Sequence, residues 1–238
     1  MEFKAVKFRR DGFYSQPFVF GGEEGAEKYD PSVRYRGSLQ NYLIDTGKEV
    51  ILVDTGIPAG TPEESPDETS PIFTGKDICS YMEAFAALGY RPEQVTKILL
   101  THRHSDHSGE LRSFPNAEIY VNREELDAEE LKGIPNLVPV DFTDGAYANF
   151  PESRKIADGI FFIKAKGHTR GNSLVIGGRR PVLSVPRGRH LCGRGAVRKQ
   201  ALHRVRRSAR RPGDAGPGAG VRAHPSHGLL RHPHAPGL

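Results

Sequence analysis

A change of composition near residue 178 limits where this chain can form a folded core. Residues 179–238 hold 14 of the 34 Lys and Arg residues but only one of the 29 acidic residues, and they contain no Phe, Tyr or Trp. Such a segment cannot bury enough apolar surface to offset the entropy that it loses on folding. We therefore expect one folded domain in residues 1–178. The basic tail, residues 179–238, is expected to be disordered or translated out of frame.

The formal charge of +5 comes from that tail, because residues 1–178 carry 20 basic and 28 acidic residues. Nucleic-acid binding is the rival interpretation of the tail, but it lacks the aromatic side chains that stack on bases. No run approaches the ~18 apolar residues of a transmembrane helix. The first ten residues lack the apolar core of a secretory signal. Because two cysteines make no disulfide framework, we expect a cytoplasmic protein.

Strand and helix patterns alternate irregularly in residues 1–178, which predicts an α/β fold. Apolar runs predict strands in residues 2–20, 41–45, 49–54, 95–100, 117–121, 159–164 and 173–176, with a hairpin joining the second and third. Helices are expected in residues 78–88, near 109–113 and in the acidic run 123–131, whose charges we interpret as a solvated face. Residues 57–74 form a Pro- and Gly-rich loop, long enough to act as a flap.

Residues 101–109 directly follow the predicted strand 95–100 and read Thr-His-Arg-His-Ser-Asp-His-Ser-Gly. Three imidazoles and a carboxylate within six residues form a ligand set that suits zinc. His102 and His104 are two positions apart, so an extended backbone points both side chains to one side. Asp106 and His107 follow where the chain turns toward a helix, so they need not bind the same metal.

Histidine is otherwise rare in the expected domain. Residues 1–178 contain four histidines, of which three lie in this cluster and the fourth is His168. A histidine-rich surface loop is the alternative interpretation, but it does not explain why the rest of the domain uses no histidine. His168 lies in a Gly-His-Thr turn after the strand 159–164, so we expect it to be a ligand as well. Zinc is the expected metal, and iron, manganese and cobalt accept the same ligands.

These motifs resemble those of the metallo-β-lactamase superfamily over about residues 35–178. The family signature His-x-His-x-Asp-His matches residues 102–107 one for one. Residues 52–56 (Leu-Val-Asp-Thr-Gly) are similar to the family's Val-Asp-Thr-Gly turn, and residues 167–169 (Gly-His-Thr) are similar to its third-histidine motif. Residues 34–47 look like the branch near the N-acyl homoserine lactonases.

The resemblance implies an αββα sandwich (an α/β or α+β fold) with two metals at one edge of its sheets. A first zinc ion would be bound by His102, His104 and His168. A second would be bound by Asp106 and His107, together with a bridging aspartate and a last histidine from further along the chain.

The chemistry expected of such a site is hydrolysis. Metal coordination lowers the pKa of water from ~15.7 toward ~7, which provides hydroxide at neutral pH. This metal-bound hydroxide would attack the carbonyl of a small-molecule ester, lactone, thioester or amide. Asp106 would act catalytically by orienting the nucleophile or relaying its proton. Asp54 would orient ligands from behind, although an Asp before Thr-Gly is equally typical of a turn.

We expect a metal-dependent hydrolase of a small ester-like substrate, with a lactone as the first choice. A thioesterase of the glyoxalase II kind or a phosphodiesterase would use the same ligands. A third alternative is an inactive metal-binding remnant, because no Asp or Glu lies between Asp158 and Asp214 to supply the bridging ligand.

A frameshift between about residues 176 and 187 would explain the missing ligands. When the tail codons are read from their second nucleotide, residues 188–191 permit Asp-Val-Thr-Tyr. An acidic segment and a Thr-His-Thr-Pro run follow in the same frame. Resequencing the gene across these codons tests the hypothesis, and an intact frame whose tail is shared by close relatives would refute it.

Overall fold

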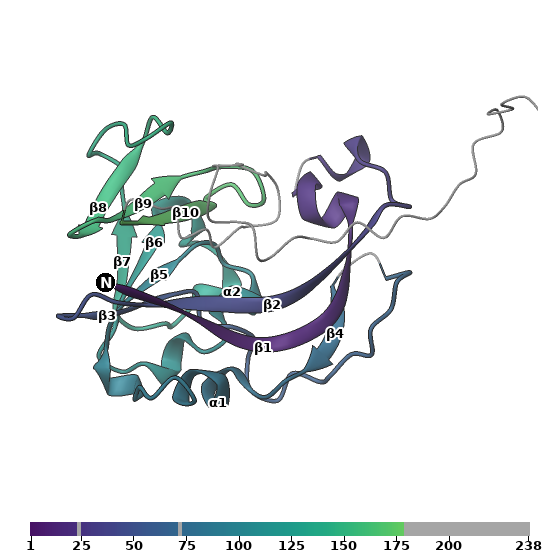
Figure 1. The fold of residues 1–238 in the computed structure, drawn as a ribbon. Coiled ribbons are helices and arrows are strands. Elements are labelled where there is room, and N and C mark those ends of the chain that lie inside the picture. The colour runs from purple at the N-terminus through teal and green to yellow at the C-terminus, as the bar shows by residue number, and fades with distance from the viewer. Residues whose placement is uncertain (23–24, 71–72, 179–238) are drawn as a thin grey trace, which may run out of the picture. The chain divides into compact units, whose positions relative to one another are not determined.

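Two β-sheets organise the part of the chain that the computed structural model describes, which is residues 1–22, 25–70 and 73–178 (Figure 1). The larger sheet has the order β4-β1-β2-β3-β5-β6-β7, and the smaller, antiparallel sheet has the order β10-β9-β8. The strands are β1 (Glu2–Ser15), β2 (Arg34–Asp45), β3 (Val50–Val53), β4 (Thr74–Asp77), β5 (Val95–Leu100), β6 (Glu118–Asn122), β7 (Leu137–Val140), β8 (Ser153–Ala157), β9 (Ile160–Lys164) and β10 (Ser173–Gly177).

The helical elements are short. Among the described residues the two α-helices are α1 (Tyr81–Ala86) and α2 (Ser105–Ser108), and a π-helical turn spans Pro17–Gly21. Single 3₁₀ turns span Ala26–Lys28, Pro92–Gln94, Leu111–Ser113, Arg123–Glu125 and Glu129–Leu131.

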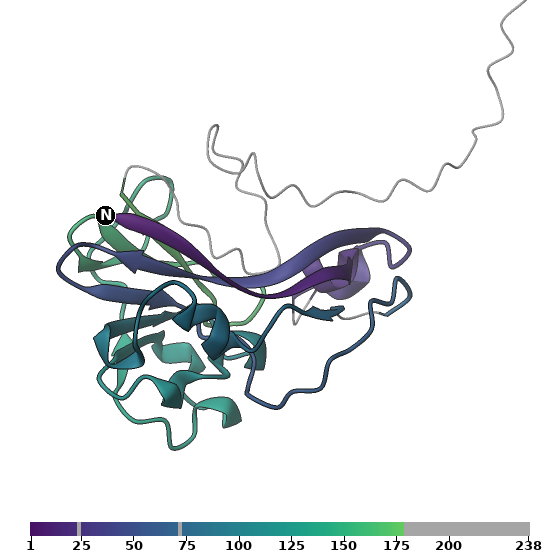
Figure 2. The same cartoon turned by 60° about the horizontal axis from the view of Figure 1, so that its bottom comes forward.

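The centre of the larger sheet is buried on both faces. β3 and β5 are parallel neighbours, and their side chains alternate between two apolar clusters. Leu52 and Ile98 face the cluster under α1, whereas Ile51 and Leu99 face the cluster shared with the smaller sheet. Parallel strands covered on both faces are typical of α/β layers. Figures 1 and 2 show the result, with α1 on one side of the larger sheet and β8–β10 on the other.

These layers confirm the predicted fold class. The described residues form three layers of the expected αββα sandwich, namely the α1 layer, the larger sheet and the smaller sheet. The predicted strand 95–100 coincides with β5, and the predicted hairpin is the antiparallel pair of β2 and β3. The tail, with the predicted frameshift and the two missing ligands, lies outside the described residues, so the domain boundary at 178 stays a prediction.

Two local predictions were wrong. Residues 18–20 are not a strand, because Pro17 starts a helical turn in which Phe18 stacks on Tyr14 (ring centroids 6.0 Å apart). The acidic run 123–131 forms two 3₁₀ turns rather than one helix, and it is not wholly solvated because Glu125 is fully buried. The predicted helix at 78–88 is shorter than expected, because a capping box of Ser80 and Glu83 starts α1 at residue 81.

Within the described ranges, no helix combines the length and the apolar character needed to cross a lipid bilayer.

Candidate metal centre

The end of β5 delivers the histidine cluster to the edge of the larger sheet. Leu99 and Leu100 are fully buried between the layers, so the strand has little freedom where it ends. The backbone stays extended through His104, whose φ and ψ are −55° and 146°, and α2 begins at the next residue. His102 is 1% exposed and His104 is half-buried, so neither imidazole lies on a solvent-exposed loop.

Three of the predicted ligands meet in space. His102, His104 and His168 each offer a ring nitrogen, and these atoms all lie within 4.8 Å of one another. The Nδ1 atom of His104 is 3.0 Å from the Nε2 atom of His168. Two nitrogens that share a tetrahedral zinc at ~2.0–2.1 Å are roughly 3.3 Å apart. The type of the donors, and the spacing of this pair, are therefore compatible with binding of a divalent metal ion.

Asp106 and His107 lie together beside this trio. The Nε2 atom of His107 is 3.5 Å from Oδ2 of Asp106, and the His107 ring centroid is 4.0 Å from that of His102. The other ring nitrogen of His107, Nδ1, is 2.7 Å from Oδ2 of Asp54. A carboxylate at Nδ1 favours the tautomer with its proton there, which leaves the lone pair on Nε2, the nitrogen that lies 3.5 Å from Asp106.

Asp54 is fully buried behind the histidines and connects three segments. Its carboxylate accepts hydrogen bonds from the backbone N–H and the hydroxyl of Thr101, at 2.8 and 2.9 Å, as well as from His107. Its backbone has a φ of 64°, which Asp tolerates better than most residues. The Tyr81 hydroxyl donates to the Asp54 carbonyl, and burial, with the Asp54 charge second, raises the Tyr81 pKa well above its ordinary value. This geometry is compatible with both interpretations of Asp54, as a turn residue and as a residue that orients a metal ligand.

The loop that carries His168 is held by hydrogen bonds to the ends of neighbouring strands. The N–H of Ser173, at the start of β10, donates to the carbonyl of Thr101 at 2.8 Å, which joins the two histidine-bearing segments. The Asn122 amide donates to the Gly171 carbonyl at 2.7 Å. Glu125 also bonds to this loop, and sequence analysis missed it. The only sequence signal for Glu125 is that it lies three residues after Asn122, which caps the 3₁₀ turn. That spacing does not distinguish a buried carboxylate from a solvent-exposed one.

Gly109 packs directly on the turn that carries Asp54. A Cβ atom there would lie 2.2 Å from the backbone nitrogen of Pro58, and the Gly109 N–H donates to the Gly56 carbonyl at 2.9 Å. We predict that Gly109→Ala lowers the free energy of unfolding by about 1–3 kcal/mol, because overpacking forces the backbone apart. Urea unfolding measures this. Gly167→Ala is the control, since its methyl group would meet nothing within 4 Å, and equal losses in both variants would contradict the prediction.

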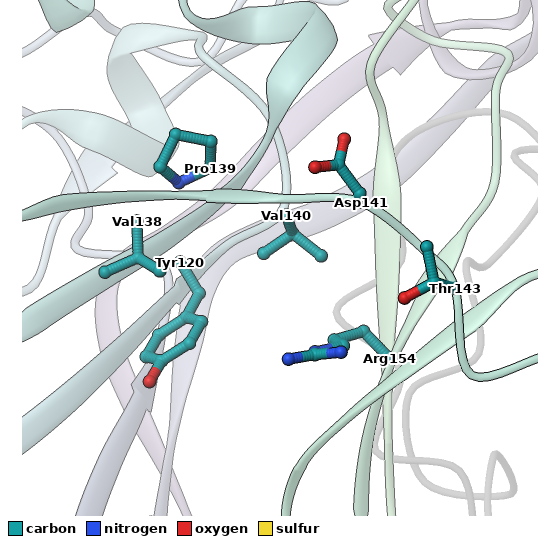
Figure 3. Close-up of a pocket in the computed structure, with 7 residues that line it drawn as sticks. All are labelled: Tyr120, Val138, Pro139, Val140, Asp141, Thr143 and Arg154. Carbon is teal, nitrogen blue, oxygen red and sulfur yellow. The ribbon is translucent and has the colours of Figure 1, made fainter.

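A separate cavity of ≈ 240 Å³ lies between the edge strand β7 and the smaller sheet (Figure 3). It is lined by Tyr120, Val138, Pro139, Val140, Asp141, Thr143 and Arg154. None of the predicted site residues contributes to it. Arg154 pairs there with Asp144, and burial raises the pKa of Tyr120 to about 12.

The sequence matches known proteins over much of its length. The profile of the metallo-beta-lactamase superfamily matches residues 36–229. An N-acyl homoserine lactonase of Bacillus sp is 30% identical over 152 residues, which are 57% of this chain and 56% of the lactonase. Metallo-beta-lactamase domain-containing protein 1 of Mus musculus is 46% identical over 88 residues, which are 37% of this chain and 27% of that protein. The chain thus spans a little over half the length of the lactonase that it matches.

Solved structures show the same fold. An N-acyl homoserine lactone hydrolase with the product N-hexanoyl-L-homoserine bound at its catalytic metal centre superposes with a TM-score of 0.54. The alignment covers 73% of this chain and 68% of that chain, at 21% identity. At this identity the likeness concerns the fold.

Proposed function

The chain belongs to the metallo-β-lactamase superfamily, and from this membership we propose that it is a metal-dependent hydrolase of a small ester-like substrate, with a lactone as the first choice. The observation that carries the proposal is the convergence of the ring nitrogens of His102, His104 and His168 within 4.8 Å, beside Asp106 and His107. These five side chains would hold zinc, in two ions when the site is complete.

Asp106 and Asp54 would have different roles in the reaction. A bound divalent metal supplies Lewis acidity, which lowers the pKa of water and polarises a carbonyl. Asp106 would accept a proton from the nucleophile and pass it to the leaving oxygen. Asp54 would keep the His107 proton on Nδ1, so that Nε2 can serve as a ligand.

Two observations favour a lactone with an apolar tail over the other esters. The Bacillus relatives are N-acyl homoserine lactonases, at 27–30% identity. In addition, a mostly aromatic hydrophobic cluster lies near the His168 loop and consists of the buried Tyr14, Val19 and Phe73 with the partly buried Phe18, Phe20, Tyr35 and Leu39 packed against them. The π-helical turn of this cluster is capped by Gly22, where a Cβ atom would lie 2.4 Å from the carbonyl oxygen of Gly167.

The function is tested by assaying the purified chain on N-acyl homoserine lactones of short and long acyl length, a thioester and a phosphodiester. We predict lactone hydrolysis that falls to the uncatalysed rate in His104→Ala, because that variant removes one of the three clustered nitrogens. Retention of full activity in His104→Ala would refute the mechanism. Preferential turnover of the thioester or phosphodiester would support those alternatives instead.

Metal content separates a working site from a remnant. Two zinc ions per chain that depend on His102 and His107 would indicate a dinuclear site, whereas one or none would indicate the remnant. The six histidines of the tail can bind zinc by themselves. The count must therefore be taken as the difference between the wild-type chain and the histidine variants.

A further inference from the structure

Glu125 is a fully buried carboxylate that the proposed mechanism does not use. It lies in the 3₁₀ turn after β6, and its side chain has a relative exposure of 0%. A buried carboxylate is costly unless donors surround it. One Glu125 oxygen, Oε1, accepts the Thr169 hydroxyl at 2.5 Å and the Gly171 N–H at 2.8 Å. The other, Oε2, accepts the Arg103 N–H at 3.1 Å.

These three donors belong to the two segments that carry the clustered histidines. Arg103 stands between His102 and His104, and Thr169 directly follows His168. One carboxylate therefore bonds to both histidine-bearing loops, which are more than 60 residues apart in the chain. The guanidinium of Arg103, 4.0 Å from Oε2, adds a positive charge on the same side.

The loop that carries His168 packs tightly against the Glu125 side chain. A Cβ atom added to Gly171 would lie 2.6 Å from Cγ of Glu125 and 2.7 Å from Oε1. Because residue 171 is glycine and has no side chain, the His168 loop approaches the carboxylate closely enough for the Gly171 N–H to donate to it. A larger side chain would not fit there. A neutral or apolar residue at 125 would leave buried donors without an acceptor.

We propose that Glu125 is a positioning residue that sets the distance between His168 and the pair His102 and His104. This inference rests on the proposed role of those histidines as metal ligands. Metal–ligand distances tolerate only about 0.2 Å of error, so the spacing of the two loops decides how well three imidazoles can share one ion. Hydrogen-bonding partners behind metal ligands typically change metal affinity by roughly 10–100-fold.

Glu125→Gln tests the inference without removing bulk. The Gln amide has one oxygen, so it can accept from the Thr169 and Gly171 side or from Arg103, but its NH₂ group faces a donor at the other end. We expect the full-length variant to bind zinc roughly 10–100-fold more weakly at the site that depends on His102. Binding is measured by chelator competition, with His102→Ala subtracted to remove binding by the tail. Cobalt absorption should also change shape, which a loss of stability alone would not produce.

Thr169 supplies a matched pair of variants. Thr169→Val keeps the shape but removes the hydroxyl donor, whereas Thr169→Ser keeps the donor. Zinc affinity should fall in the Val variant and stay within about threefold of wild type in the Ser variant. Ser153→Ala is the stability control, because it removes a buried hydroxyl bond to the Gly145 carbonyl in the loop before β8.

The outcomes separate this inference from the proposed function. Wild-type zinc affinity in Glu125→Gln, equal losses in both Thr169 variants, or the same loss in Ser153→Ala would each overturn the positioning role. Zinc binding by the wild-type chain without lactone hydrolysis would overturn the proposed function alone. A wild-type chain that binds no zinc in a His102-dependent way would overturn both.

Discussion

Replacing Asp106 with Asn is expected to lower kcat for lactone hydrolysis by about 10²–10⁴-fold, the usual contribution of a general acid–base group. The side chain is 16% exposed and its Oδ2 atom lies 3.5 Å from Nε2 of His107, so it faces the clustered imidazoles rather than bulk solvent. Asn keeps the size of Asp but cannot take up a proton. The measurement is kcat at saturating lactone and saturating zinc.

Excess zinc distinguishes the two roles assigned to Asp106. If Asp106 acts only as a ligand, added zinc will restore kcat in Asp106→Asn, and the proton-relay role will be wrong. If it also moves the proton, kcat will stay low when the site is filled. Asp141→Asn is the matched control, because Asp141 is a surface carboxylate that pairs with Arg123 and is 54% exposed. Its kcat should equal that of the wild-type chain.

The strands and the ligand-bearing loops were predictable because their signals are local. Residues 95–100 read Val-Thr-Lys-Ile-Leu-Leu, and a β-branched start that ends in three consecutive apolar residues favours a strand buried on both faces. The alternation of His102 and His104 on an extended backbone likewise depends on neighbours alone, and the structure places the two rings 4.8 Å apart. His168 was predicted from the scarcity of histidine, and it does lie with them. The ligand roles themselves stay predictions.

The misses share a physical cause, which is that tertiary contacts override local patterns. The run 123–131 has the composition of a solvated helix, yet Glu125 turns inward because Arg103, Thr169 and Gly171 offer it donors. None of those contacts is visible from the residues around position 125. β4, β7 and β8 were also missed, and all three are edge strands. β7 contains Pro139 and is an edge strand, where the propensity signal is weak and pairing with β6 decides the conformation.

A frameshift between about residues 176 and 187 is our proposal for the origin of the basic tail. Its consequence for the site is specific, since the proposed second metal has Asp106 and His107 but no bridging aspartate in residues 159–213. A chain rebuilt in the alternative frame after about residue 187 should therefore gain a second zinc ion. Unchanged metal content in that chain would count against the frameshift as the source of the missing ligands.

Among the substitutions considered, Asp54→Ala is expected to have the largest effect on folding, whereas Asp54→Asn should mainly affect the metal site. Asp54→Ala removes the acceptor of two buried hydrogen bonds from Thr101 and one from His107. Each buried donor left unsatisfied costs about 1–3 kcal/mol, and Ala is also less suited than Asp to a φ of 64°. We expect the free energy of unfolding in urea to fall by about 3–5 kcal/mol, near the upper limit for a single substitution.

Asp54→Asn should instead preserve most of the fold and damage the metal site. Asn tolerates a positive φ, and its amide oxygen can still accept the Thr101 N–H, which lies 2.8 Å from Oδ1 of Asp54. Its NH₂ group then replaces Oδ2 and donates to Nδ1 of His107, so the His107 proton must move to Nε2. A protonated nitrogen cannot bind a metal. Loss of His107-dependent zinc with near-normal urea unfolding is therefore the expected result. Normal zinc binding by Asp54→Asn would show that Asp54 only shapes the turn.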